Sequence, residues 1–185
     1  LRPANYSEQA PGKGYIVLEK NGYKILIISL IGQVFMSMNY DNPFIQADEI
    51  LSNLANNNLS AIIVDMHAEA TSEKIALGYY LDGRVSAVIG SHTHVQTSDA
   101  RVLESGTALI TDVGMTGFAD GVLGVDKHGV IKTFLSQIKQ PHIIPESGPA
   151  VFNAVAITID SKTAKAQSIK PITKYIYITD VIASD

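Results

Sequence analysis

The chain has 185 residues, enough for one domain with a sizeable core, and 46% of them are hydrophobic while 17% are charged. The formal net charge is -4, from 14 basic and 18 acidic residues, and the lack of a basic block argues against an extended nucleic-acid surface. The sequence contains no cysteine, which excludes disulfides, thiolate metal sites and cysteine nucleophiles. Any metal must therefore be held by nitrogen or oxygen ligands.

The sequence also bears on where the protein resides and where its chain starts. The longest apolar run, Ile25 to Ile31, is interrupted by Ser29 and is far too short to cross a bilayer. With no signal-peptide pattern either, we expect a cytoplasmic protein without a membrane partner. The chain opens at Leu1 without an initiator methionine, which we interpret as a start inside a larger protein or a cleaved chain.

The first third of the chain predicts a hairpin, a helix and a buried strand. Asn21-Gly22 is a strong turn signal, so Tyr15 to Glu19 and Tyr23 to Ile31 are expected to pair as a hairpin. Apolar residues at helical spacing predict a helix over Asp48 to Asn56. The short apolar run from Ala61 to Asp65 is typical of a strand that is buried on both faces.

The rest of the chain continues to mix helices and strands. Thr71 or Ser72 can cap a helix whose packed side carries Ile75, Ala76 and Tyr79. The remaining predicted elements are a buried strand over 85–89, a hairpin of 100–103 with 107–111, an amphipathic helix over 127–138, and strands over 150–160, 165–170 and 175–179. Residues 1–185 therefore predict a single α/β domain with mixed sheets.

Three of the five histidines follow directly after two predicted buried strands, as Asp65-Met66-His67 and Ser91-His92-Thr93-His94. Sites assemble at strand ends because the strands are rigid and the loops can vary. In an extended segment, residues two apart point to the same side, so His92 and His94 could reach one metal or two neighbouring metals. An isolated His-x-His is more often accidental, but its combination with His67 favours a metal site.

The other histidines and the nearby acidic residues have simpler interpretations. His128 and His142 are expected to be exposed. Glu69 could be a partner of a metal ligand or a general base, whereas Glu73 suits the first turn of a helix. Asp65 is either on the side of His67 or a buried structural carboxylate.

The glycine-rich segment from Thr111 to Gly117 follows another predicted strand. A tight surface loop is the favoured interpretation of this segment. Its Asp112 could alternatively contact a metal or orient a histidine.

Four stretches of the chain together resemble the YmdB-like metallophosphoesterases of the calcineurin-like superfamily. They follow one another in the family's order over nearly the whole chain, as Arg2–Tyr6 with Pro11–Gly14, Ile63–Lys74, Gly90–Thr97 and Thr111–Gly117. The resemblance implies a calcineurin-like α/β sandwich of two mixed β-sheets flanked by helices, present here as its C-terminal two-thirds.

The resemblance also implies a function and a set of ligands. His67 and His92 would ligate one metal and His94 the other, with Ser91 where the wider class usually has glycine. The two ions would be divalent or trivalent Fe, Mn or Zn, and a water bridging them would attack a small phosphodiester substrate such as 2′,3′-cAMP. The family's remaining ligands and its proton-donor histidine are expected upstream of residue 1, so this chain alone is expected to be an incomplete enzyme with no catalytic acid of its own.

Two alternatives remain open from the residues. His67, His92 and His94 could form a complete mononuclear zinc site, with Glu69 or Asp112 as base. The chain could instead be a non-catalytic regulatory module on a phosphoesterase scaffold. Exposed Tyr175 and Tyr177 would suit either a homo-oligomer interface or an edge strand.

Overall fold

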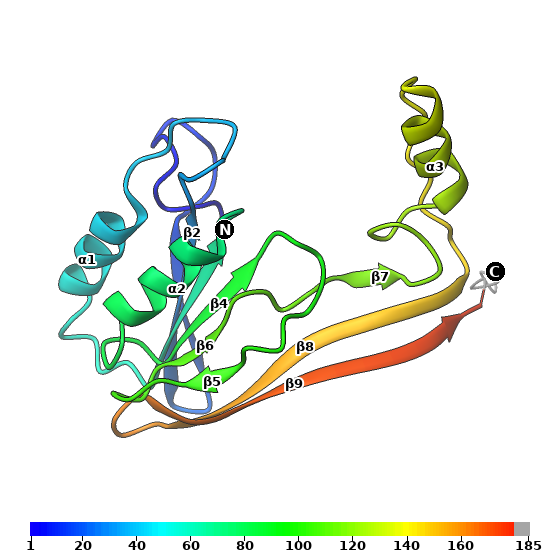
Figure 1. Cartoon of the computed structure of the whole chain (residues 1–185). Helices are drawn as coiled ribbons and strands as arrows, with labels where there is room; N and C mark the ends of the chain where they lie inside the picture. Colours follow the sequence, from blue (N-terminus) through cyan, green and yellow to red (C-terminus); the bar gives the residue numbers. More distant parts are fainter. Residues whose placement is uncertain (180–185) are drawn as a thin grey trace, which may run out of the picture.

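The computed structural model describes residues 1–179, in which the chain forms two sheets and three helices (Figure 1). The larger sheet has the strand order β1-β2-β3-β4-β6-β5, and the smaller has the order β7-β8-β9. The strands of the larger sheet are β1 (Tyr15–Lys20), β2 (Tyr23–Ile31), β3 (Ala61–His67), β4 (Ala87–Ser91), β5 (Arg101–Val102) and β6 (Ala108–Ile110). The remaining elements are β7 (Thr116–Phe118), β8 (Gly148–Asp160), β9 (Lys165–Ile178), α1 (Pro43–Asn53), α2 (Thr71–Tyr80) and α3 (Lys127–Ser136).

The larger sheet is mixed, as the sequence predicts. β1 and β2 form the predicted hairpin around Asn21 and Gly22, whose φ angles of 54° and 80° are those that a tight turn of this kind requires. The central strands β2, β3, β4 and β6 are parallel, and β5 returns antiparallel to β6 as the second predicted hairpin. Because His67 pairs with Ser91 in register, the carboxyl ends of β3 and β4 lie side by side.

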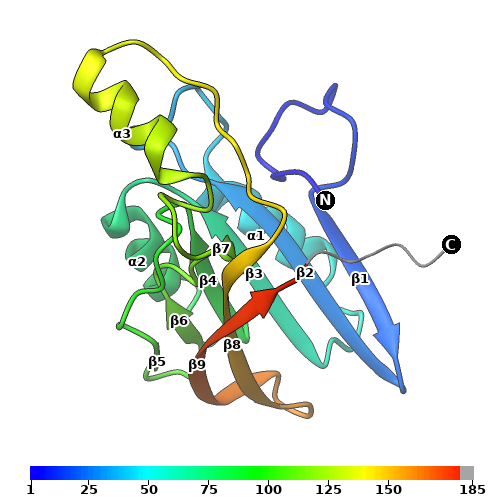
Figure 2. The same cartoon turned by 90° about the vertical axis from the view of Figure 1, so that its right-hand side faces the viewer.

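The two faces of the larger sheet bury different layers. One face packs against α1 and α2 through a core that includes Leu26, Val64, Met66, Leu77 and Val88. The alternate strand residues Ile63, Ala87 and Ile89 belong to a second cluster with Ala166, Ile157 and Ile169 of β8 and β9. Figure 2 shows this arrangement from the side, with the long β8–β9 ribbon crossing the larger sheet. The predicted α/β sandwich is therefore confirmed, although both pairings of its smaller sheet are antiparallel rather than mixed.

Both helices next to the sheet differ in detail from the sequence prediction. α1 begins at Pro43 instead of Asp48, because the Asn42 side chain caps it by accepting from the amides of Phe44 and Ile45. The N-cap of α2 is Ala70, which makes no side-chain cap bond, so the predicted cap at Thr71 or Ser72 is wrong.

The packed face of α2 is also not the predicted one. Its buried residues are Glu73, Lys74, Leu77 and Gly78, whereas Tyr79 is exposed. Gly78 allows close approach to the sheet, because a Cβ there would lie 2.8 Å from Leu109 Cδ1. The side of α2 that faces the sheet therefore carries two charged residues.

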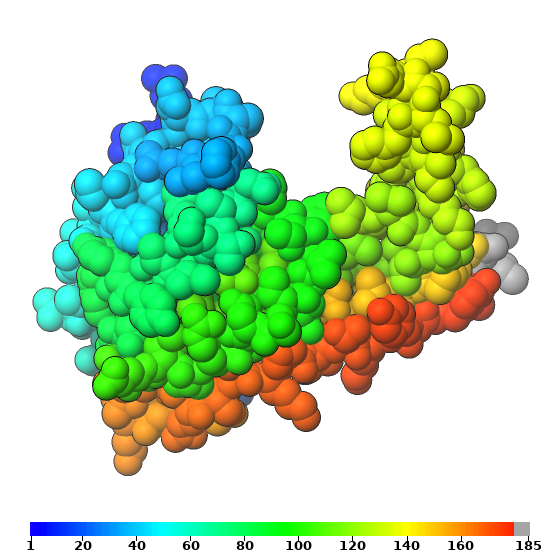
Figure 3. Space-filling view, viewed as in Figure 1, coloured from blue at the N-terminus to red at the C-terminus, as the bar shows by residue number. Residues whose placement is uncertain are grey.

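The C-terminal strands and α3 form an extension from the sandwich. β9 is one strand through Pro171, where two strands were predicted, since an edge strand tolerates a proline. α3 has no buried residue, and Figure 3 shows it in yellow as an arm beyond a broad hollow in the molecular surface. Within residues 1–179, no helix combines the length and the apolar character that crossing a bilayer demands.

Candidate metal centre

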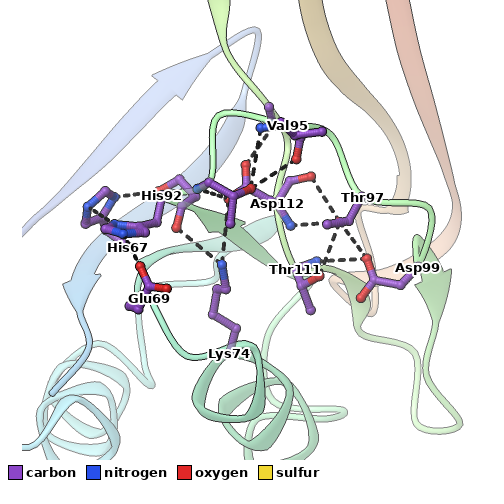
Figure 4. Close-up of polar contacts among 12 residues, drawn as sticks. His67, Glu69, Lys74, His92, Val95, Thr97, Asp99, Thr111 and Asp112 are labelled. Carbon is purple, nitrogen blue, oxygen red and sulfur yellow. Dashed lines mark hydrogen bonds and ion pairs between the residues drawn. The ribbon is translucent and has the colours of Figure 1, made fainter. Parts of the chain in front are cut away.

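The adjacent ends of β3 and β4 bring two of the three predicted ligands together. His67 is the last residue of β3, and His92 follows the last residue of β4. His67 Nε2 and His92 Nδ1 are 3.1 Å apart, and the two rings meet edge to face with centroids separated by 4.9 Å. Figure 4 shows the two imidazoles pointing at one another between the two strand ends.

The other nitrogen of each ring has an oxygen partner. His92 Nε2 lies 2.5 Å from a carboxylate oxygen of Glu69, and His67 Nδ1 lies 3.1 Å from the hydroxyl of Ser91. The Ser91 hydroxyl in turn lies 3.4 Å from Asp65, which faces the same side of β3 as His67. Histidine ligands of metals commonly donate their second N–H to a carboxylate or another oxygen, which fixes the tautomer. Such bonds here would leave His67 Nε2 and His92 Nδ1 with lone pairs aimed at each other.

The facing nitrogens suit a shared cation. Two lone pairs at 3.1 Å repel unless a proton or a metal ion lies between them. Two nitrogens bound to one ion at about 2.0–2.1 Å lie roughly 3.0–3.4 Å apart for usual coordination angles. The donor pair therefore fits one metal ion of the borderline class that neutral imidazole prefers.

The charge state of His67 is consistent with this fit. Partial burial lowers the pKa of His67, and the neighbouring His92 and Lys74 lower it further, against the opposing influence of Asp65 and Asp112. A lowered pKa keeps the ring neutral near pH 7, and neutral imidazole is the form that binds a metal.

His94 is placed differently from the pair. Its side chain is exposed, and its carbonyl accepts the Met115 amide at 3.1 Å. Both histidines of the His-x-His segment have positive φ, 138° for His92 and 66° for His94, so the segment is not extended. The expectation that extended backbone points both rings to one side is therefore wrong. Such φ values cost about 1–3 kcal/mol each and are found where surrounding contacts impose them, often at functional sites.

The contacts that hold this backbone come from Asp112, two residues after the end of β6. One carboxylate oxygen accepts the Thr93 amide at 2.7 Å, and the other accepts the Gly114 amide at 2.9 Å. Lys74 Nζ of α2 lies 3.7 Å from this carboxylate and 3.5 Å from the Ser91 carbonyl oxygen. Asp112 is only 1% exposed, so the favoured interpretation of its segment as a tight surface loop is wrong at this residue. Its carboxylate contacts the backbone of the histidine loop and not a histidine ring.

The remaining acidic residues have distinct positions. Asp65 is exposed, so its interpretation as a buried structural carboxylate is wrong. The surrounding protein atoms still remove part of its hydration, which raises the pKa of the Asp65 carboxyl, and the hydrogen bond from the Ser91 hydroxyl partly offsets this rise. Glu73 is buried and accepts the amides of Gln33 and Val34. Gly32 donates to the His67 carbonyl at 2.8 Å, so Glu73 holds a loop that adjoins the histidine pair.

Taken alone, the described residues do not build a complete metal site. Within residues 1–179, no group of three or more histidine, aspartate and glutamate side chains is arranged to hold an ion. The complete three-histidine zinc site that the sequence left open is thus not assembled there. His128 and His142 are exposed, as predicted. A cavity of about 420 Å³ at the opposite end of β3, lined by Lys20, Tyr23, Ala61 and Ile157 among others, contains none of the histidines.

One residue of this site was not anticipated from the sequence. Lys74 is 1% exposed and is the largest fully buried side chain among residues 1–179. A lysine beside Glu73 near the start of a helix has the sequence pattern of a solvated surface residue. Only the packing of α2 against β4 and β6 reveals its contact with Asp112.

Comparison with known proteins gives consistent matches along the chain. The sequence profile of the family described as "YmdB-like protein" matches residues 1–172. A Bacillus subtilis (strain 168) protein named 2′,3′-cyclic-nucleotide 2′-phosphodiesterase is 48% identical over 172 residues, which are 93% of this chain and 64% of that protein. The chain spans less than two thirds of the length of the curated relatives it matches.

Two solved structures have closely similar folds. A hypothetical protein from Thermus thermophilus superimposes with a TM-score of 0.85 at 39% identity, covering 95% of this chain and 67% of that one. A structure described as a novel phosphatase from Mycoplasma pneumoniae gives a TM-score of 0.83 at 32% identity, covering 97% of this chain and 64% of that one. These matches agree with the predicted resemblance and with the sandwich architecture.

Proposed function

We propose, from the premise that this chain belongs to the YmdB-like protein family, that it forms part of a metal-dependent phosphodiesterase acting on 2′,3′-cyclic nucleotides. The observation that carries the proposal is the 3.1 Å approach of His67 Nε2 and His92 Nδ1 at adjacent strand ends. The name of the Bacillus subtilis relative supports the substrate class. The proposed partner is accordingly a small phosphodiester.

In this proposal His67 and His92 hold one metal ion, and His94 is a ligand of a second. Glu69 and Ser91 orient the two rings of the pair through their second nitrogens. A pair of bound ions lowers the pKa of a water nucleophile and neutralises charge on the phosphoryl oxygens. The ions are Fe, Mn or Zn, because nitrogen and carboxylate ligands suit all three.

In this proposal the residues of this chain bind the metal ions and orient the metal ligands. They do not supply the proton for the leaving group. His67 and His92 are occupied as ligands, and the exposed Glu69 carboxylate is paired with His92. We assign the proton donor and the missing ligands to the part of the family's sequence that this chain does not cover. Residues 1–185 are then the larger portion of one phosphoesterase domain. A cytoplasmic location and a homo-oligomeric state stay predictions from the sequence.

The competing functions predict different behaviour. A mononuclear zinc hydrolase would hold one ion on His67, His92 and His94, whereas only His67 and His92 are in contact among the described residues. A non-catalytic module would have no need for two histidine rings that approach each other this closely at adjacent strand ends. Both observations favour the two-metal phosphodiesterase.

The test is hydrolysis of 2′,3′-cAMP by the full-length protein that contains this chain, supplied with Mn²⁺. We expect His92→Ala and His67→Ala each to lower kcat/KM by more than about 100-fold, since losing a ligand should cost at least as much as losing a residue that orients one. His128→Ala, at an exposed histidine of α3, is the matched control and should retain the rate. Retention of the rate and of bound metal by His92→Ala would refute the assignment.

A further inference from the structure

The pair of Lys74 and Asp112 is the most deeply buried charged contact near the histidines. Both side chains are 1% exposed, and Lys74 Nζ lies 3.7 Å from an Asp112 carboxylate oxygen. Burying two opposite charges is costly unless their remaining hydrogen-bonding capacity is satisfied. In some proteins buried polar groups are retained because they specify one conformation.

The hydrogen-bonding capacity of the Asp112 carboxylate is satisfied by two backbone amides, one in the histidine loop and one in its own loop. It accepts from Thr93, between His92 and His94, and from Gly114, two residues further along its own loop. Lys74 adds a contact to the carbonyl of Ser91, the residue just before His92. Residues 91 and 93 are thereby held on both sides of His92.

The backbone held in this way is strained. His92 and His94 both have positive φ, which is uncommon for residues with a Cβ. A second set of bonds braces the far end of the loop, where the Thr97 amide donates to the Asp112 carbonyl and the Asp112 amide donates to the Thr97 hydroxyl. The strain persists because these bonds oppose its relaxation.

We propose that Lys74 and Asp112 are positioning residues that hold the Ser91–Thr97 loop in its metal-binding conformation before any metal arrives. The pair touches neither metal nor substrate and acts through the Ser91 and Thr93 backbone. Its role is to place His92 Nδ1 opposite His67 Nε2, so it sets metal affinity rather than proton transfer. The inference rests on the proposed metal-binding function of His67 and His92.

The first test uses amide hydrogen exchange of the metal-free, full-length protein. The Thr93 amide, although in an exposed residue, should be protected together with the Gly114 amide, because both donate to a buried carboxylate. Rapid exchange of Thr93 in the metal-free protein would overturn the proposal, since the loop would then not be held in advance. This test requires no substitution and does not depend on whether a variant folds.

The second test is Mn²⁺ titration by calorimetry of Lys74→Met and Asp112→Asn. Methionine keeps most of the unbranched length of Lys74 without its charge, and asparagine has only one oxygen for two amides. We expect both variants to bind Mn²⁺ about 10–100-fold more weakly, as is usual for residues that orient ligands. Circular dichroism verifies that each variant is folded.

Asp82→Asn provides the matched control. The Asp82 carboxylate also accepts two backbone amides, from Ser105 and Thr107, but it lies beyond the other end of the sheet. We expect its Mn²⁺ affinity to stay within about twofold of wild type. Folded Lys74→Met and Asp112→Asn proteins with wild-type affinity would overturn the proposal. A wild-type protein that binds no Mn²⁺ would instead refute the proposed function, while hydrogen exchange would still decide whether the pair fixes the loop.

Discussion

Gly90, the residue before Ser91 in β4, is the position at which adding one methyl group should disturb the site most directly. An ideal Cβ built on Gly90 would lie 1.9 Å from the Thr111 carbonyl oxygen and 2.9 Å from Lys74 Cδ. The Thr111 oxygen belongs to the backbone, so no side-chain rotation removes the clash. Either β4 or the Thr111 segment must shift by about 1.5 Å to restore ordinary contact.

The expected magnitude of Gly90→Ala follows from this geometry. Overpacking a core costs about 1–3 kcal/mol, and a clash with backbone belongs at the upper end of that range. A shift would also strain the bond from the Val113 amide to the Gly90 carbonyl, which is now 3.0 Å long. For a protein of this size, about 3 kcal/mol corresponds to a decrease in Tm of roughly 6–12 °C.

The assay is thermal unfolding followed by circular dichroism, with Gly117→Ala as the control glycine. A Cβ on Gly117 would meet nothing within 4 Å, and its φ is not in the positive range. Gly117→Ala should therefore leave the free energy of unfolding unchanged or raise it by up to about 1 kcal/mol, so Tm should not fall. A Gly90→Ala protein with the Tm of wild type would refute the close approach of β4 to Thr111.

Three further substitutions test other parts of the structure. Glu73→Ala should lower stability by about 2 kcal/mol in urea denaturation, because it leaves two loop amides without their buried acceptor; an unchanged urea midpoint would contradict that anchoring role. Asp48→Asn should lower stability at pH 7 by only about 0.2–1 kcal/mol, since the ion pair with Arg84 is exposed. Bonds from Tyr80 and Arg84 lower the Asp48 pKa, so this stabilisation is present above the unfolded pKa of about 3.9 and is lost as pH falls through the folded value. If the difference in free energy of unfolding between wild type and Asp48→Asn were as large at pH 3 as at pH 7, the ion pair would not be the source of that difference. Phe134→Ser, at a side chain that is 81% exposed on α3, should change stability by less than about 0.5 kcal/mol, and a Tm decrease above about 4 °C would show that α3 is packed.

Local sequence signals were sufficient for the strands of the larger sheet and for the positions of two candidate ligands. The Asn21-Gly22 turn predicted the first hairpin, and the apolar runs before His67 and Ser91 predicted the buried strands. Because adjacent parallel strands end together, all three histidines were expected to meet if these two strands are neighbours, and among residues 1–179 only His67 and His92 are brought into contact. The contact between their rings confirms the expected placement for this pair.

Features that depend on contacts distant in sequence could not be predicted in this way. Helical spacing placed Tyr79 on the packed side of α2, but the helix turns Lys74 and Glu73 inward because Asp112 and the loop amides satisfy their charges. β9 continues through Pro171 because its partner β8 pairs with it on both sides of that residue. The apolar face of α3 followed the expected pattern, yet no residue of the helix is buried.

Elemental analysis of bound metal tests the central claim, that His67 and His92 share one ion within a two-metal centre, most directly. The full-length protein, loaded with Mn²⁺ and exchanged extensively into metal-free buffer, should retain two ions per chain, and His92→Ala should retain one. The 185-residue chain alone should retain nearly none, because its described residues offer only the histidine pair. One tightly held metal ion in that chain, lost on His94→Ala, would contradict the account and establish a complete three-histidine site instead.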